Sequence, residues 1–137
     1  MTTVEINPDT RAQFLEPTFS KYPGFEQQLV AEFKYCKDRN ITTDIFGNDA
    51  AFTFPSAAVD AQLFRIHIKL PGEKPWPPGT TDFKKTSDTY LIYAQHMWEP
   101  THYSIMGVVT PAHTLMSSRN TQLIVHFAEC AEQFHSR

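Results

Sequence analysis

The clearest hydrophobic pattern in the chain is the alternation in residues 63–70, LFRIHIKL. Apolar side chains alternate there with cationic or titratable ones: Phe64, Ile66, Ile68 and Leu70 against Arg65, His67 and Lys69. A period of two predicts a half-buried strand that presents Arg65, His67 and Lys69 on an open face. Two further strands are predicted at 90–94 and 103–109, because both runs are rich in β-branched and aromatic residues.

Apolar positions at helical spacing predict two longer helices. The stripe of residues 22–39 consists of Phe25, Leu29, Val30, Phe33 and Cys36. The stripe of residues 120–134 consists of Leu123, Ile124, Phe127, Ala131 and Phe134, and Asn120 is a suitable N-cap. A shorter helix is predicted over 7–16, with Asn7 as cap, Pro8 in the first turn and Pro17 as its end.

Two segments carry no clear period. Residues 43–55 contain the turn signal Gly47-Asn48-Asp49, so we expect an irregular loop pinned to the core by Ile45, Phe46, Phe52 and Phe54. Residues 71–81 are rich in proline and form a stiff connection, in which Trp76 is either a core plug or a surface on which a base stacks. Helices at both ends of a run of consecutive strands predict an α+β fold with a small antiparallel sheet.

Composition narrows the class of protein. A chain of 137 residues predicts one domain over 1–137, and a formal charge of −3 argues against a generic DNA-coating protein. Charged and titratable side chains are distributed unevenly along the chain, since residues 61–137 hold seven basic side chains, six acidic ones and all six histidines. Two cysteines in no metal-like spacing, no signal-peptide pattern and no membrane-length apolar run predict a cytoplasmic protein without metal or other cofactor.

Residues 82–94, DFKKTSDTYLIYA, hold the densest candidate chemistry. Lys84, Lys85 and Asp88 stand in a loop that leads directly into a predicted strand. His67 precedes this stretch, and His113 and Arg119 follow it. Cleavage of RNA without a metal needs a base, an acid and positive charge, so these side chains form a candidate site on one face of the sheet. Which group is the base stays open, and a solvated loop before a core strand is the alternative. We expect the remaining histidines on the surface or, for His126, at the edge of the last helix: His96, His102, His126 and His135.

Five stretches, taken in order, resemble the YafO family of bacterial type II toxins. They are DIFGNDA at 44–50, RIHIKL at 65–70, WPP at 76–78, FKKTSDTYLIY at 83–93 and TPAHTLMSSRN at 110–120. The resemblance implies a RelE-like fold and a ribosome-dependent endoribonuclease that cleaves translated mRNA and is neutralised by a YafN-like antitoxin. It also implies the ribosome and mRNA as partners, no membrane, and DNA contact only through the antitoxin. Lys85 stands where the family commonly has arginine, so this site lacks the planar two-pronged contact to phosphate.

Two other functions fit the residues alone. The chain could be a toxin relative that binds a partner without cleaving RNA, or a small-molecule enzyme that uses His67 and His113. The net negative charge favours a binding module over a free ribonuclease, because free RNA is held mainly by basic surface. The same net charge is a weaker argument against a toxin that docks in the ribosome through a local patch.

Overall fold

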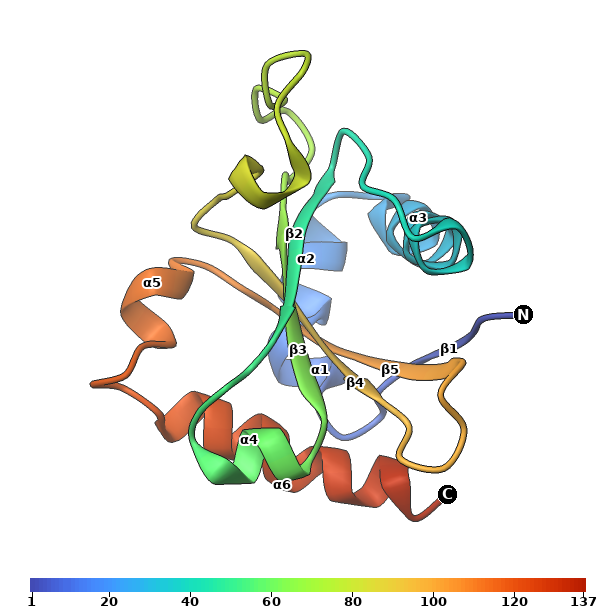
Figure 1. Cartoon of the computed structure of the whole chain (residues 1–137), viewed down its shortest axis with the longest axis vertical. Coiled ribbons are helices and arrows are strands. Elements are labelled where there is room, and N and C mark those ends of the chain that lie inside the picture. The colour runs from blue at the N-terminus through green and yellow to red at the C-terminus, as the bar shows by residue number, and fades with distance from the viewer.

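The computed structural model describes residues 1–137 as one five-stranded sheet with helices on both of its faces (Figure 1). The strands are β1 (Thr3–Ile6), β2 (Phe46–Ala51), β3 (Leu63–Ile68), β4 (Tyr90–Gln95) and β5 (His102–Val109). The helices are α1 (Arg11–Phe14), α2 (Glu16–Lys21), α3 (Phe25–Arg39), α4 (Ser56–Asp60), α5 (Ala112–Leu115) and α6 (Gln122–His135), and a 3-10 turn, η1, spans Asp82–Lys84. No helix has the length and apolar character needed to cross a membrane.

The strand order is β1-β5-β4-β3-β2, and every pair except β1–β5 is antiparallel. The predicted α+β class and the three predicted strands are therefore confirmed. The β3–β4 register pairs His67 with Tyr90, and the β4–β5 register pairs Tyr90 with Val109. Residues from three neighbouring strands thus meet at one end of the sheet.

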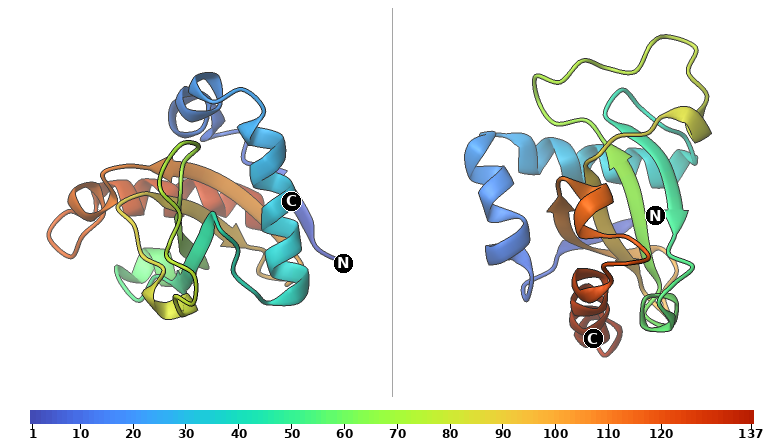
Figure 2. Two further views of the ribbon diagram at one scale, coloured as in Figure 1. Left: turned by 90° about the horizontal axis from the view of Figure 1, so that it is seen from above. Right: turned by 90° about the vertical axis from the view of Figure 1, so that its left-hand side faces the viewer.

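The sheet is buried on both faces, so it separates two hydrophobic cores. One core packs α6 and α4 against Ile92 and Met106, and the other packs α3 against Leu91 and Ile105. The two long helices, both predicted, therefore lie on opposite faces (Figure 2). The prediction of an open face on β3 is wrong for His67, whose exposed fraction is only 8%. β3 is an inner strand of the sheet. At the end that carries His67, its polar side is covered by Ser87, which precedes β4, and by His113, which follows β5.

The N-terminal segment differs from the predicted single helix over 7–16. Residues 3–6 form β1, which pairs in parallel with β5, and two short helices follow. The predicted cap at Asn7 is wrong, because Thr10 is the N-cap of α1; the Asn7 Oδ1 instead accepts the amides of Asp9 and Thr10 in the turn before this helix. Pro17 does not end a helix but lies in the first turn of α2, where the missing N–H of proline has no helical partner to lose.

Residues 43–55 were expected to be irregular, and this prediction is wrong because they contain the edge strand β2. A register shift between Phe46 and Asp49 places Gly47 and Asn48 in a bulge, where turn-forming residues are tolerated within a strand. Phe46 is buried as expected, but Phe54 is 42% exposed and does not pin the loop. At the other end of the chain Thr121, not Asn120, is the N-cap of α6.

Candidate catalytic site

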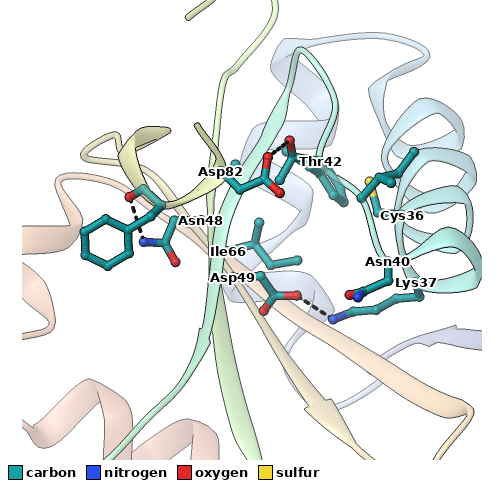
Figure 3. A pocket seen from close by; sticks show the side chains of 12 residues that line it. Cys36, Lys37, Asn40, Thr42, Asn48, Asp49, Ile66 and Asp82 are labelled. Carbon is teal, nitrogen blue, oxygen red and sulfur yellow. Dashed lines mark hydrogen bonds and ion pairs between the residues drawn. The ribbon is translucent and has the colours of Figure 1, made fainter. Parts of the chain in front are cut away.

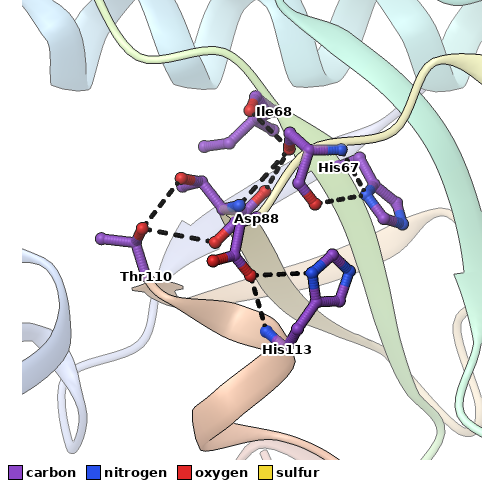
Figure 4. Close-up of polar contacts among 7 residues, drawn as sticks. His67, Ile68, Asp88, Thr110 and His113 are labelled. Carbon is purple, nitrogen blue, oxygen red and sulfur yellow. Dashed lines mark hydrogen bonds and ion pairs between the residues drawn. The ribbon is translucent and has the colours of Figure 1, made fainter.

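Two histidines and a tyrosine meet where β3, β4 and α5 come together. The ring of His67 lies 6.4 Å from that of His113, measured between centroids, and the Tyr90 ring lies 4.7 Å from His67 and 5.7 Å from His113. His67 and Tyr90 are register partners on neighbouring strands, whereas His113 stands in the first turn of α5. The predicted pairing of His67 with His113 is therefore present in the fold (Figure 4).

Asp88 connects the β4 strand to α5 and orients His113. One carboxylate oxygen of Asp88 accepts the backbone N–H of His113 at 2.7 Å and lies 2.9 Å from its Nδ1. The carbonyl oxygen of Asp88 also accepts the amide of Ala112 at 2.8 Å. The side chains of Asp88 and His113 are 50% and 62% exposed, so the free Nε2 edge of the imidazole is open to a ligand.

His67 is held by the segment before β4 in a different environment. Its Nδ1 lies 2.9 Å from the carbonyl oxygen and 2.8 Å from the amide nitrogen of Ser87. The hydroxyl of Ser87 in turn lies 2.9 Å from the carbonyl oxygens of Ile68 and Thr89, which fixes the segment to β3. Burial lowers the pKa of His67, and the neighbouring Arg65 and His113 add to this effect. His67 is thus a neutral imidazole at neutral pH.

Arg65 and Tyr90 belong to the same cluster, although sequence reasoning did not select them. The guanidinium carbon of Arg65 lies 5.7 Å from the Tyr90 ring centre and 5.2 Å from that of Phe52. Burial raises the pKa of Tyr90, so its hydroxyl stays protonated and available as a donor. The alternation of 63–70 does place Arg65 and His67 on one face. The pairing of His67 with Tyr90 depends on strand register, which one sequence does not reveal.

Lys85 is not brought to the histidines. Its ammonium donates to the hydroxyl of Thr42 at 3.0 Å and to the carbonyl oxygen of Thr43 at 3.3 Å, both on the connection between α3 and β2. It also lies 5.9 Å from the Trp76 ring centre. These contacts make Lys85 an anchor of its own loop.

Lys84 and Arg119 are both exposed and form no ion pair within the chain. Lys84 ends η1, four residues before Asp88, and Arg119 lies on the connection between α5 and α6. Each side chain is therefore free to meet an anionic ligand, and their convergence on the histidine pair stays a prediction.

Three of the other histidines, His96, His102 and His135, make packing or hydrogen-bond contacts within the fold. The expected surface position of His96 is wrong, because its ring is 4% exposed, stacks on His102, and accepts the amides of Trp98 and Glu99. Nε2 of His135 lies 2.6 Å from the carbonyl oxygen of Ala61. His126 is exposed on α6, as expected for the edge of this helix. No three metal-binding side chains lie close enough together to hold an ion.

A cavity of about 310 Å³ lies between β2 and the C-terminal end of α3 and is lined by both polar and apolar groups (Figure 3). At one side, Lys37 pairs with Asp49 and donates to the Tyr93 hydroxyl, which also contacts Asp49 at 2.8 Å. Burial, followed by the charge of Asp49, raises the pKa of Tyr93 well above its ordinary value. Since these three groups satisfy one another, only the remaining lining residues are free to receive a ligand.

Comparison with known proteins gives one family. The family model described as "Toxin YafO, type II toxin-antitoxin system" matches residues 32–136, which include the histidine pair, Asp88 and all of β2 to β5. Neither the curated proteins nor the solved structures yielded a match. The match begins within α3, so β1, α1 and α2 lie outside it.

Proposed function

The chain belongs to the YafO family of toxins of type II toxin–antitoxin systems, and from this premise we propose that it is a ribosome-dependent endoribonuclease. It cleaves translated mRNA in the cytoplasm and so stops protein synthesis. Membership of a type II system implies an antitoxin partner, which we propose to be YafN-like and to carry any DNA contact of the complex. The observation that carries the enzymatic proposal is the pair His67 and His113, whose ring centroids are 6.4 Å apart and of which one is buried and the other exposed.

In the proposed reaction His67 is the general base. The reactive tautomer of this proposal carries its proton on Nδ1, where the Ser87 carbonyl oxygen 2.9 Å away accepts it, in place of the tautomer in which Nδ1 accepts the Ser87 amide at 2.8 Å. In the reactive tautomer Nε2 keeps its lone pair for the 2′-hydroxyl proton. The lowered pKa of His67 supports this role, because a base must be unprotonated at the working pH. The 2′-oxygen then attacks the adjacent phosphorus.

His113 is the general acid. Its protonated ring forms an ion pair with Asp88, which points the opposite nitrogen toward the substrate. As the bond between phosphorus and the 5′-oxygen breaks, His113 delivers its proton to that oxygen. The products are a 2′,3′-cyclic phosphate and a free 5′-hydroxyl, and the proton taken by His67 balances the one released by His113.

Positive charge is needed where the phosphorane forms. Arg65 lies beside Tyr90 within the cluster, and the exposed Lys84 and Arg119 can close over the phosphate from the loop and from the α5–α6 connection. Lys85 contributes by holding the loop in place. Because the chain carries a net charge of −3, we propose that ribosomal RNA contributes to the positioning of the mRNA, which makes cleavage depend on translation.

Induced expression in bacteria tests the proposal. Wild type should arrest growth, and new mRNA 5′ ends should appear only on messages that are being translated. His113→Ala should abolish both effects, whereas His126→Ala, which also removes an exposed imidazole, should abolish neither. Growth arrest without new 5′ ends would identify a binding module that blocks translation without cleavage. Equal cleavage of untranslated RNA would remove the requirement for the ribosome.

A further inference from the structure

Phe83 is the most exposed of the chain's phenylalanines, and its position is difficult to explain by packing. It lies in the middle of η1 with an exposed fraction of 80%, although the chain buries most of its other phenylalanines. A large apolar side chain in solvent gains nothing from the hydrophobic effect. A single exposed ring is common on protein surfaces, so the case for a ligand at Phe83 rests on the groups that surround it.

Polar contacts on both sides of Phe83 hold its backbone. Asn48 Nδ2 donates to the Phe83 carbonyl oxygen at 3.1 Å, and the hydroxyl of Thr42 donates to Asp82 at 2.7 Å. The amide of Asn48 bonds the carbonyl oxygen of Lys85 at 2.9 Å. The aromatic ring is thus presented on a fixed turn, so little conformational entropy is lost when a ligand covers it.

The cavity of about 310 Å³ beside β2 is lined by Phe83 together with groups that can hydrogen-bond a flat polar ligand. The side-chain amide of Asn40 forms no hydrogen bond within the chain, and Asn48 and Asp82 each use only one of their side-chain polar atoms. In Figure 3 Asn40 lies beside Lys37 and Asp49, whereas Asn48 lies to the left of them and bonds the Phe83 carbonyl oxygen. This volume is at the lower end for small-molecule sites and suits a ligand the size of one base.

We propose that Phe83 and this cavity bind one unpaired base of single-stranded RNA, an inference that rests on the proposed function because that RNA is the substrate. Bases stack on exposed aromatic rings and present polar edges to amide and carboxylate groups. The base binds beside the scissile phosphate and positions it. Phe83 is therefore a positioning residue and takes no part in proton transfer.

The cavity lining holds Lys37 against Asp49 and Asp82, whereas the loop that carries Phe83 is basic. The charge of this loop and its chain distance from the histidine pair favour RNA over a protein partner. Residues 69–86 carry Lys69, Lys74, Lys84 and Lys85 against Glu73 and Asp82, a net of +2 in a chain whose overall charge is −3. Phe83 is five residues from Asp88, and five residues span at most about 18 Å. A short stretch of RNA can therefore reach both the Phe83 ring and the histidine pair.

The test is binding of a fluorescein-labelled, single-stranded 2′-O-methyl hexanucleotide, which cannot be cleaved because it lacks the 2′-hydroxyl. Fluorescence anisotropy at low salt should show that Phe83→Ala weakens binding by about 5- to 150-fold, the usual worth of one stacked base. Phe83→Trp should restore binding to within about threefold of wild type, since a larger ring still stacks. The matched control is Trp98→Ala, which removes another ring that is 77% exposed, on the β4–β5 connection.

Circular dichroism should show that all three variants fold, because both side chains are largely in solvent. The inference is overturned if Phe83→Ala weakens binding no more than Trp98→Ala does, in which case Phe83 serves a protein interface. It is also overturned if wild type does not bind the hexanucleotide at millimolar concentration. Binding that depends on Phe83 without any mRNA cleavage would leave the inference standing and remove the proposed nuclease. Cleavage of mRNA that is unaffected by Phe83→Ala would overturn the inference and leave the proposed nuclease standing.

Discussion

At the scale of single residues, the site depends on how differently two histidines are surrounded. His67 is buried against Tyr90 and Ser87, whereas His113 is exposed and paired with Asp88. The sequence identified both histidines and Asp88, because titratable residues beside predicted strands are recognisable from type and spacing. It could not predict that His67 is buried, since this depends on the covering of β3 by segments distant in sequence. It also could not predict that Lys85 turns toward Thr42.

The lowered pKa of His67 predicts a pH dependence of stability. Burial places the folded-state pKa below 6.5, so the unfolded chain binds more protons as the pH falls through this region. The contribution of His67 is then fully present above pH 6.5 and is lost as the pH falls through the folded-state pKa. Urea unfolding across this range should show a free energy of unfolding that decreases with acidity, and His67→Gln should flatten the slope. An unchanged slope in His67→Gln would assign the effect to other groups.

The same environments predict the pH profile of cleavage. The acid limb of the profile should fall below 6.5, because His67 must lose its proton to act as base and its pKa is lowered. Single-turnover rates on ribosomes measure this limb directly. His67→Ala should remove it along with most of the activity, and a limb that persists in this variant would place the base elsewhere.

At the scale of elements, the sequence predicted the strongly periodic segments and missed the weakly periodic ones. β3, β4, β5, α3 and α6 follow from spacing alone. β1 is four residues long and pairs with β5, about a hundred residues later, so no local signal marks it. β2 contains a bulge with Gly47 and Asn48, and the same residues signal a turn when read without their partner strand.

Gly47 is the point at which the loop that carries Phe83 packs on β2. A Cβ added there would overlap with the carbonyl oxygen of Lys85 and lie 2.9 Å from Trp76. Gly47→Ala should therefore displace the loop, lower the free energy of unfolding by about 1–3 kcal/mol, and shift the fluorescence of Trp76. Proteolysis of the loop should become faster for the same reason.

Gly72→Ala is the control for this prediction. Gly72 lies in the same loop at φ 87°, and nothing is within 4 Å of an added Cβ. This variant carries backbone strain without a steric clash, so it should leave the Trp76 signal and the proteolysis rate of the docked loop unchanged. If Gly47→Ala behaves in the same way as Gly72→Ala, the close packing at Gly47 is not what holds the loop.

At the scale of the whole molecule, a sheet covered on both faces positions the site at one end and the N-terminal strand at one edge. The two-sided core was not predicted, because alternation in β3 indicates a polar face without showing that other segments cover it. The family match starts at residue 32, so β1 is an addition to the matched region that closes the β5 edge. Thr2 ties this strand to α3 through two hydrogen bonds to Asp38.

Removal of residues 1–6 tests what β1 contributes. The truncated chain loses the β1–β5 ladder and exposes the β5 edge, so its free energy of unfolding should fall by about 2–4 kcal/mol, at about 1 kcal/mol for each backbone hydrogen bond. Size-exclusion chromatography should show self-association through the open edge. Removal of Met1 alone, which is fully exposed, is the control and should have no effect. Equal stability of the truncated and full chains would show that β1 is dispensable.

The proposed catalysis by the histidine pair is tested most directly by single-turnover cleavage on programmed ribosomes. Wild type should cut the bound mRNA and leave the same mRNA intact in the absence of ribosomes. Loss of a general acid costs about 10²- to 10⁴-fold in rate. The cleavage rate of His113→Ala should therefore fall by at least about a hundredfold, while that of His126→Ala stays at the wild-type value. A folded His113→Ala variant within about threefold of wild type would contradict the account, because so small a loss excludes a general acid at this position.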